Sequence, residues 1–136
     1  MIQEFVQIWD KYKGEIEDQF REDHPGSYGD IVEAVITMLH KHSENEYCKP
    51  DPKKIHLIDD GYYQGTLLFV IPEDGYQPHE YWYVRVWYGS CSGCDTLERI
   101  RSEGWYDENE AVKEKQVKEY MMLALNVLQE LKKMGE

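Results

Sequence analysis

The sequence lacks a long apolar run, has few cysteines and is poor in positive charge, and each deficit excludes a class of protein. The apolar stretches among its 136 residues, such as 67–71, are all well short of the ~20 residues that cross a bilayer. The first residues show no basic stretch followed by an apolar one, so we expect no signal peptide. Its three cysteines are an odd number, which intramolecular disulfides cannot use up and which favours reduced thiols in a cytoplasm.

The charge balance is strongly acidic. The chain has 15 Lys and Arg against 27 Asp and Glu, which gives a formal net charge of −12. No segment has the basic footprint that phosphate backbones require, so we expect neither ordinary nucleic-acid binding nor attraction to anionic membranes. The excess of acid accounts for solubility, and it also fits a protein that meets a basic partner.

The length and the apolar periodicity predict one folded domain spanning 1–136. Apolar residues at three- and four-residue steps predict a helix over about 2–22. Asp30 and Glu33 have capping-box spacing and predict the start of a second helix. The stripe of the first helix comprises Ile2, Phe5, Val6, Trp9, Tyr12, Ile16 and Phe20, and the buried face of the second comprises Ile31, Val32, Val35, Met38 and Leu39.

A long helix is predicted at the other end of the chain. Asp107 and Glu110 repeat the capping-box spacing, and an apolar stripe continues to about Met134. Such a helix would be about 40 Å long, more than a small sheet can cover, so its end could pack on a second copy. A short helical segment is expected near 96–102.

Three segments in the middle of the chain have the features of strands. Residues 54–58 are predicted as a short strand, and 66–71 are almost entirely apolar, which is typical of a central strand covered on both faces. Residues 81–88 alternate, with Trp82 and Val84 on one side and Tyr81 and Tyr83 on the other. Short connections favour an antiparallel meander. We therefore predict an α+β fold of order ααβββα: a three-stranded antiparallel meander with two N-terminal helices and a long C-terminal helix.

A loop of six small residues follows the last predicted strand. Glycines and a helix start together can offer free N–H groups to an anion, although no phosphate-binding motif is present. A tight strand-to-helix turn, capped by Asp95 or Thr96, is the simpler interpretation. The candidate ligand-binding residues in this segment are Gly89, Ser90, Ser92, Gly93, Asp95 and Thr96.

Cys91 and Cys94 in this loop form a Cys-x-x-Cys pair with three interpretations. They are plain thiols, or a thiol–disulfide pair, or half of a zinc site, since zinc needs about four ligands. Cys48, with one of the histidines His40, His42, His56 and His79, could complete such a site. We expect no cofactor beyond this zinc hypothesis.

Asp59 and Asp60 lie in the connection between the first two predicted strands. In a meander, this turn and the glycine–cysteine loop leave from the same end of the sheet. We therefore predict that Asp59, Asp60 and residues 89–95 line one pocket. A hairpin stabilised by Asp-Gly turn chemistry is the alternative.

The histidines and aromatic residues give weaker signals. His40 and His42 are two residues apart, which places them on different faces of a helix, so a joint ligand role is not expected. His56 is the nearest candidate base for a nucleophilic thiol, yet no signature fixes that pair. We therefore expect binding rather than catalysis. The outer half of the aromatic band at 81–88 is predicted to stack on a helix, a base or a subunit.

Two motifs resemble a group of small uncharacterised bacteriophage proteins. They are Ile-Asp-Asp-Gly-x-Tyr-Gln-Gly-Thr at 58–66 and Tyr-Gly-Ser-Cys-Ser-Gly-Cys-Asp-Thr-Leu at 88–97, within about 50 residues of similarity. The resemblance transfers no activity. It implies expression in the cytoplasm of an infected bacterial cell.

Three hypotheses for function follow. The first is a small acidic accessory protein, a homodimer in one version, that binds a host or defence protein or a small anionic ligand without catalysis. The second is a thiol- or zinc-dependent enzyme using Cys91 and Cys94. The third is a virion structural or assembly component.

Overall fold

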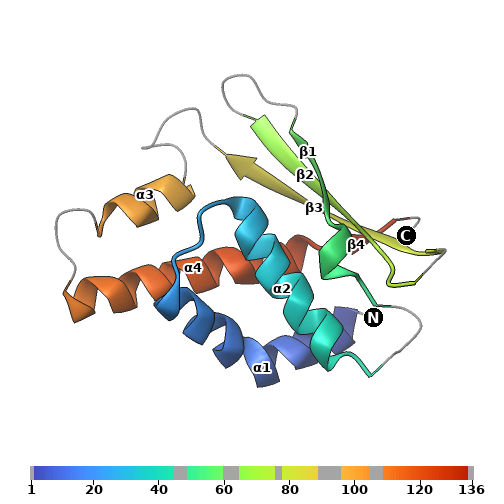
Figure 1. Cartoon of the computed structure of the whole chain (residues 1–136), viewed down its shortest axis with the longest axis horizontal. Coiled ribbons are helices and arrows are strands. Elements are labelled where there is room, and N and C mark those ends of the chain that lie inside the picture. Colours follow the sequence, from blue (N-terminus) through green and yellow to red (C-terminus); the bar gives the residue numbers. More distant parts are fainter. Residues whose placement is uncertain are drawn as a thin grey trace.

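The computed structural model describes residues 2–44, 49–59, 65–75, 78–88, 96–104 and 109–134. Within them the chain forms an antiparallel sheet with a layer of helices on one face (Figure 1). The elements, in chain order, are α1 (Ile2–Glu22), α2 (Tyr28–His42), the 3₁₀ helix η1 (Pro52–Lys54), β1 (His56–Asp59), β2 (Gly65–Pro72), β3 (Tyr81–Tyr88), α3 (Thr96–Ser102), α4 (Glu110–Glu130) and β4 (Lys132–Lys133).

The sheet has the strand order β1-β2-β3-β4, with every pair antiparallel. The meander and the α+β class are thus confirmed, while the fourth strand was not predicted. Phe69, Ile71, Trp82 and Val84 point from β2 and β3 toward the helices and are buried. Their packing against the helices is exemplified by Phe5 of α1, whose ring centroid is 6.4 Å from that of Trp82. No helix in the described part of the chain is long and apolar enough to cross a membrane.

The end of α4 differs from the prediction. The helix ends at Glu130, not near Met134, and its 21 residues span about 31 Å. Leu131 leaves the helical path and is buried, and Lys132 and Lys133 then pair with β3. The N–H of Met134 donates to the Tyr81 carbonyl at 2.8 Å. The apolar residues keep helical spacing beyond the end of α4, so this spacing predicted too long a helix. Local spacing could not show that β3 offers backbone groups with which the following segment pairs.

The helix starts also differ from the predictions. Ser27 caps α2 and accepts from the N–H of Asp30, so Asp30 lies one turn inside the helix. The Asp30 carboxylate in turn accepts a hydrogen bond from the N–H of Gly26 at 2.8 Å. The capping arrangement therefore lies three residues earlier in the chain than predicted. α4 is capped by Asn109, and Asp107 lies outside the described residues.

The predicted stripe of α1 is confirmed at Phe5, Trp9, Ile16 and Phe20, which are buried, and Tyr12 is partly buried. Val6 is instead 45% exposed, and Ile8, which was not predicted, is buried. The side chain of Ile2 lies outside the described residues. The predicted buried face of α2 is confirmed at all five positions. The first strand is 56–59 rather than 54–58, because 52–54 form the 3₁₀ turn η1.

In the described part of the chain, helices cover only one face of the sheet. Leu68 and Val70 of β2, which point away from the helices, are only partly buried, and Tyr81 on the same outer face is 38% exposed. The expectation that 66–71 would be covered on both faces is therefore wrong for the described residues. The alternation predicted for 81–88 is confirmed at 81–86, and the side chains of Trp87 and Tyr88 lie outside the described residues.

Candidate functional site

The meander brings three strand ends to one end of the sheet. Asp59 at the end of β1 lies opposite Leu67, and Gly65 at the start of β2 lies opposite Tyr88 at the end of β3. The segments that join these strands and lead into α3 therefore leave from the same end, as the sequence predicted. Residues 60–64 and 89–95 themselves lie outside the described residues.

A cleft of about 280 Å³ lies at this end of the sheet, between the sheet and the first turns of α2 and α3. We call it the sheet-end cleft. Its lining residues come from α2 and the turn before it, β1, β2 and α3: Gly26, Ser27, Tyr28, Gly29, Leu57, Asp59, Leu67, Leu97 and Glu98.

The wall between α2 and α3 is fixed by a buried hydrogen bond. The N–H of Leu97, in the first turn of α3, donates to the hydroxyl of Tyr28 at 3.1 Å. Both side chains are nearly inaccessible, at 7% for Tyr28 and 4% for Leu97. The hydroxyl thereby satisfies one of the N–H groups that a helix start leaves without an intrahelical partner. Tyr28 thus ties the start of α3 to α2 beside the cleft.

The open side of the cleft is apolar and acidic. Leu57 lies opposite Phe69, so it is on the helix side of the sheet, yet it is 48% exposed because β1 is at the margin. Among the described lining residues, the charged ones are Asp59 and Glu98, and the Glu98 carboxylate also forms an ion pair at 4.0 Å with Arg101 on the same helix. An apolar wall with carboxylates suits an aliphatic or basic group better than an anion.

The predicted site residues are only partly placed. Asp59 lines the cleft, and Thr96 begins α3 next to the lining residue Leu97. Thr96 itself lines a neighbouring cavity of about 190 Å³, and Tyr28 borders both spaces. The other predicted residues lie outside the described residues: Asp60, Gly89, Ser90, Cys91, Ser92, Gly93, Cys94, Asp95 and Cys48.

No described residue at the cleft supports the hypotheses of catalysis or of metal binding. His56 lies opposite Val70, so it is on the outer face of the sheet and does not line the cleft. No group of three or more His, Cys, Asp or Glu that could hold a metal ion occurs among the described residues. The cysteines are not among these residues, and their role stays a prediction.

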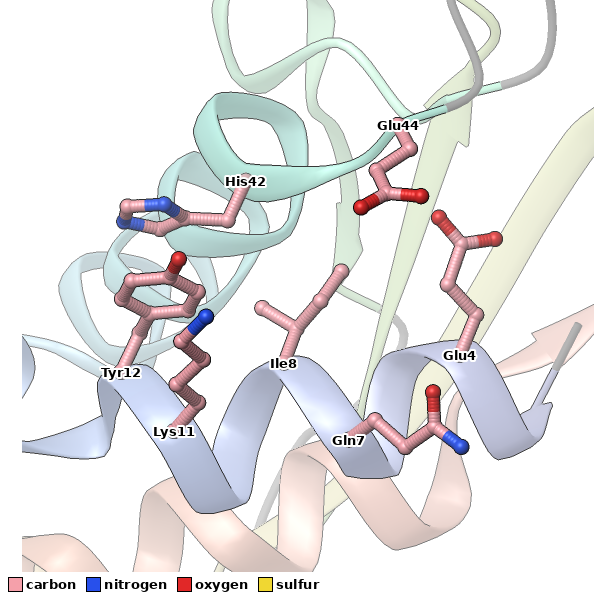
Figure 2. Close-up of a pocket in the computed structure, with 7 residues that line it drawn as sticks. All are labelled: Glu4, Gln7, Ile8, Lys11, Tyr12, His42 and Glu44. Atoms are coloured by element: carbon pink, nitrogen blue, oxygen red, sulfur yellow. The ribbon is translucent and has the colours of Figure 1, made fainter.

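A second, larger groove of about 510 Å³ lies between the first half of α1 and the end of α2 (Figure 2). The imidazole of His42 stacks on the ring of Tyr12, with centroids 3.4 Å apart and an interplanar angle of 5°. The Nε2 atom of His42 lies 3.0 Å from both carboxylate oxygens of Glu15. At the other end of the groove, Ser43 donates to the Glu4 carboxylate at 2.8 Å.

The groups in this α1–α2 groove lock two helices together. The hydrogen bond with His42 is the main cause that lowers the pKa of the Glu15 carboxyl below its ordinary value. His40 points to another side of α2, where its Nε2 atom lies 2.7 Å from Asp74. The prediction that His40 and His42 lie on different faces is confirmed. Sequence spacing missed their carboxylate partners, because Glu15 and Asp74 are far away along the chain.

Comparison with protein-family models, with curated proteins and with solved structures finds no match to this chain.

Proposed function

We propose that the protein is a non-enzymatic binding protein, a small acidic accessory protein of the bacteriophage type, and that the sheet-end cleft recognises a protein of the host or of its defence systems. The observation that carries this proposal is the composition of the cleft. Its apolar wall, formed by Leu57, Leu67 and Leu97, is bordered by the carboxylates of Asp59 and Glu98. This combination favours binding of a side chain from a partner protein over binding of a small anionic ligand, which the first hypothesis also named.

The net charge supports the same choice. A chain with a net charge of −12 attracts basic surfaces and accelerates their diffusional encounter, while it repels nucleotides and phosphate. The binding partner is therefore expected to present a basic surface with exposed apolar residues.

Leu57→Lys tests the proposal without disturbing the core. Leu57 is 48% exposed, so the substitution places an ammonium at the mouth of the cleft at little cost in stability. Val6→Lys is the matched control, because Val6 is 45% exposed, lies on α1 and does not line the cleft. The tagged wild-type protein and both variants are used to capture partners from bacterial lysate, and the captured proteins are identified and quantified by mass spectrometry.

We expect a host protein that binds the wild type and Val6→Lys equally and that is lost with Leu57→Lys. Equal capture by all three chains would contradict the proposal, and recovery of phage structural proteins alone would favour an assembly role. A thermal-shift screen with nucleotides and phosphate is the counter-test. A ligand at 100 times its dissociation constant adds about 2.7 kcal/mol of stability, so a clear shift would favour the anionic ligand instead.

A further inference from the structure

Strand β1 is the margin of the sheet on the side of the sheet-end cleft. It pairs with β2 on one side, and no described strand pairs with its other side. All four of its residues are exposed. A strand at the edge of a sheet presents backbone N–H and C=O groups at alternate residues, which can pair with a strand from another chain.

The two apolar side chains of β1 point to opposite faces. Leu57 is on the helix side, where it lines the cleft, and Ile58 lies opposite Leu68 on the outer face. They are 48% and 45% exposed. A strand added beside β1 would cover both, because its own side chains would alternate between the same two faces.

The chemistry of each face selects the side chains of the added strand. On the cleft side, a Lys or Arg residue can lay its aliphatic stem on Leu57 and Leu97 and bring its charged group to the carboxylates of Asp59 and Glu98. On the outer side, an apolar residue can pack on Ile58. We infer that β1 and the sheet-end cleft together bind an extended segment of another protein in which basic and apolar residues alternate.

This inference rests on the proposed function and gives the chemical class of its partner. A second copy of the chain fits the edge less well, because each copy carries a net charge of −12 and would bring further acids to a cleft whose charged residues, among those described, are acidic. A basic segment has the complementary charge.

The test uses the full chain and a synthetic peptide, Val-Lys-Val-Arg-Val-Lys-Val with blocked ends. An otherwise identical peptide with Glu at the three basic positions is the matched control. Binding is measured by fluorescence anisotropy, and amide hydrogen exchange at 56–59 is followed by NMR. We expect the basic peptide to bind and to slow exchange in β1, whereas the acidic peptide does neither.

Two variants separate strand addition from simple filling of the cleft. Leu57→Lys and Ile58→Lys should each weaken binding of the basic peptide by about tenfold or more, while Val6→Lys leaves it unchanged. Because Ile58 does not line the cleft, its effect is expected only if the peptide runs along β1.

Three outcomes would overturn the inference. They are equal binding of both peptides, binding without protection of 56–59, and protection of 56–59 that depends on protein concentration alone, which would indicate pairing of two copies. If Leu57→Lys still abolishes capture of a host protein in any of these cases, the cleft is a binding site and only strand addition is wrong. If neither capture nor peptide binding depends on Leu57, the proposed function fails as well.

Discussion

At the scale of single residues, two histidines near the end of α2 connect this helix to two other parts of the chain. His42 contacts Glu15 of α1, and His40 contacts Asp74 in the connection after β2. Each interaction joins segments that are distant in sequence. Both pairs lie near the surface, so we expect each to contribute only about 0.2–1 kcal/mol.

The pair of His40 and Asp74 predicts a specific pH dependence. The hydrogen bond with His40 is the main cause that lowers the pKa of Asp74 below its ordinary value of 3.8. Because the carboxyl has a lower pKa in the folded state than in the unfolded state, its stabilising contribution is complete above pH 3.8 and is lost as the pH falls through the folded-state value. Asp74→Asn should therefore lower the free energy of unfolding at pH 6 by less than ~1 kcal/mol, and this difference should shrink as the pH falls below 3.8.

Urea unfolding of the wild type and Asp74→Asn across this pH range provides the measurement. Asp10→Asn is the control, since it removes one exposed carboxylate at a position outside the pair. A difference between wild type and Asp74→Asn that stays constant with pH would show that the carboxyl does not act through its charge.

At the scale of the elements, the sequence predicted what depends on local periodicity. The apolar spacing gave α1 and the buried face of α2 correctly, and the alternation at 81–88 gave β3 with its bounds. What failed depends on partners that are distant along the chain. The residues near Lys132 and Lys133 do not indicate that this segment pairs with the edge of β3. Ser27 and Asp30 are both suitable N-cap residues, and only the three-dimensional structure shows that Ser27 takes this position.

The candidate site was predictable to a similar extent. The strand order, inferred from short connections, placed Asp59 and the start of α3 at one end of the sheet. The apolar wall was not predicted, because it requires knowing that Leu57 remains exposed at the margin of the sheet. Tyr28 was missed for a related reason: its hydroxyl meets the N–H of Leu97, a contact across 69 positions that no local pattern encodes.

The pairing of β4 with β3 gives a prediction at this scale. Met134→Pro removes the N–H that donates to the Tyr81 carbonyl, and the residue before it, Lys133, already has the extended backbone that proline requires. We expect a loss of about 0.5–1.5 kcal/mol relative to Met134→Ala, which keeps the N–H and removes the same exposed side chain. Chemical denaturation measures the difference. Equal stability of the two variants would show that this hydrogen bond contributes nothing to the sheet.

At the scale of the whole molecule, the net charge of −12 opposes folding as well as self-association. Compact packing of excess like charges is unfavourable, and salt screens the repulsion. Salt also weakens surface ion pairs, such as those of Arg21 with Asp18 and Glu114, but exposed pairs contribute little to begin with. The repulsion is therefore expected to dominate the response to ionic strength.

The free energy of unfolding at pH 7 should consequently rise when NaCl increases from 0.01 M to 0.15 M, because the Debye length falls from about 30 Å to about 8 Å. Urea, which is uncharged, is the denaturant for this measurement. A variant with Asp10→Lys and Glu22→Lys has a net charge of −8, since each substitution adds two charges to −12, and both positions are exposed. Its response to salt should be smaller than that of the wild type. A wild-type stability that falls with NaCl would mean that the ion pairs outweigh the net repulsion.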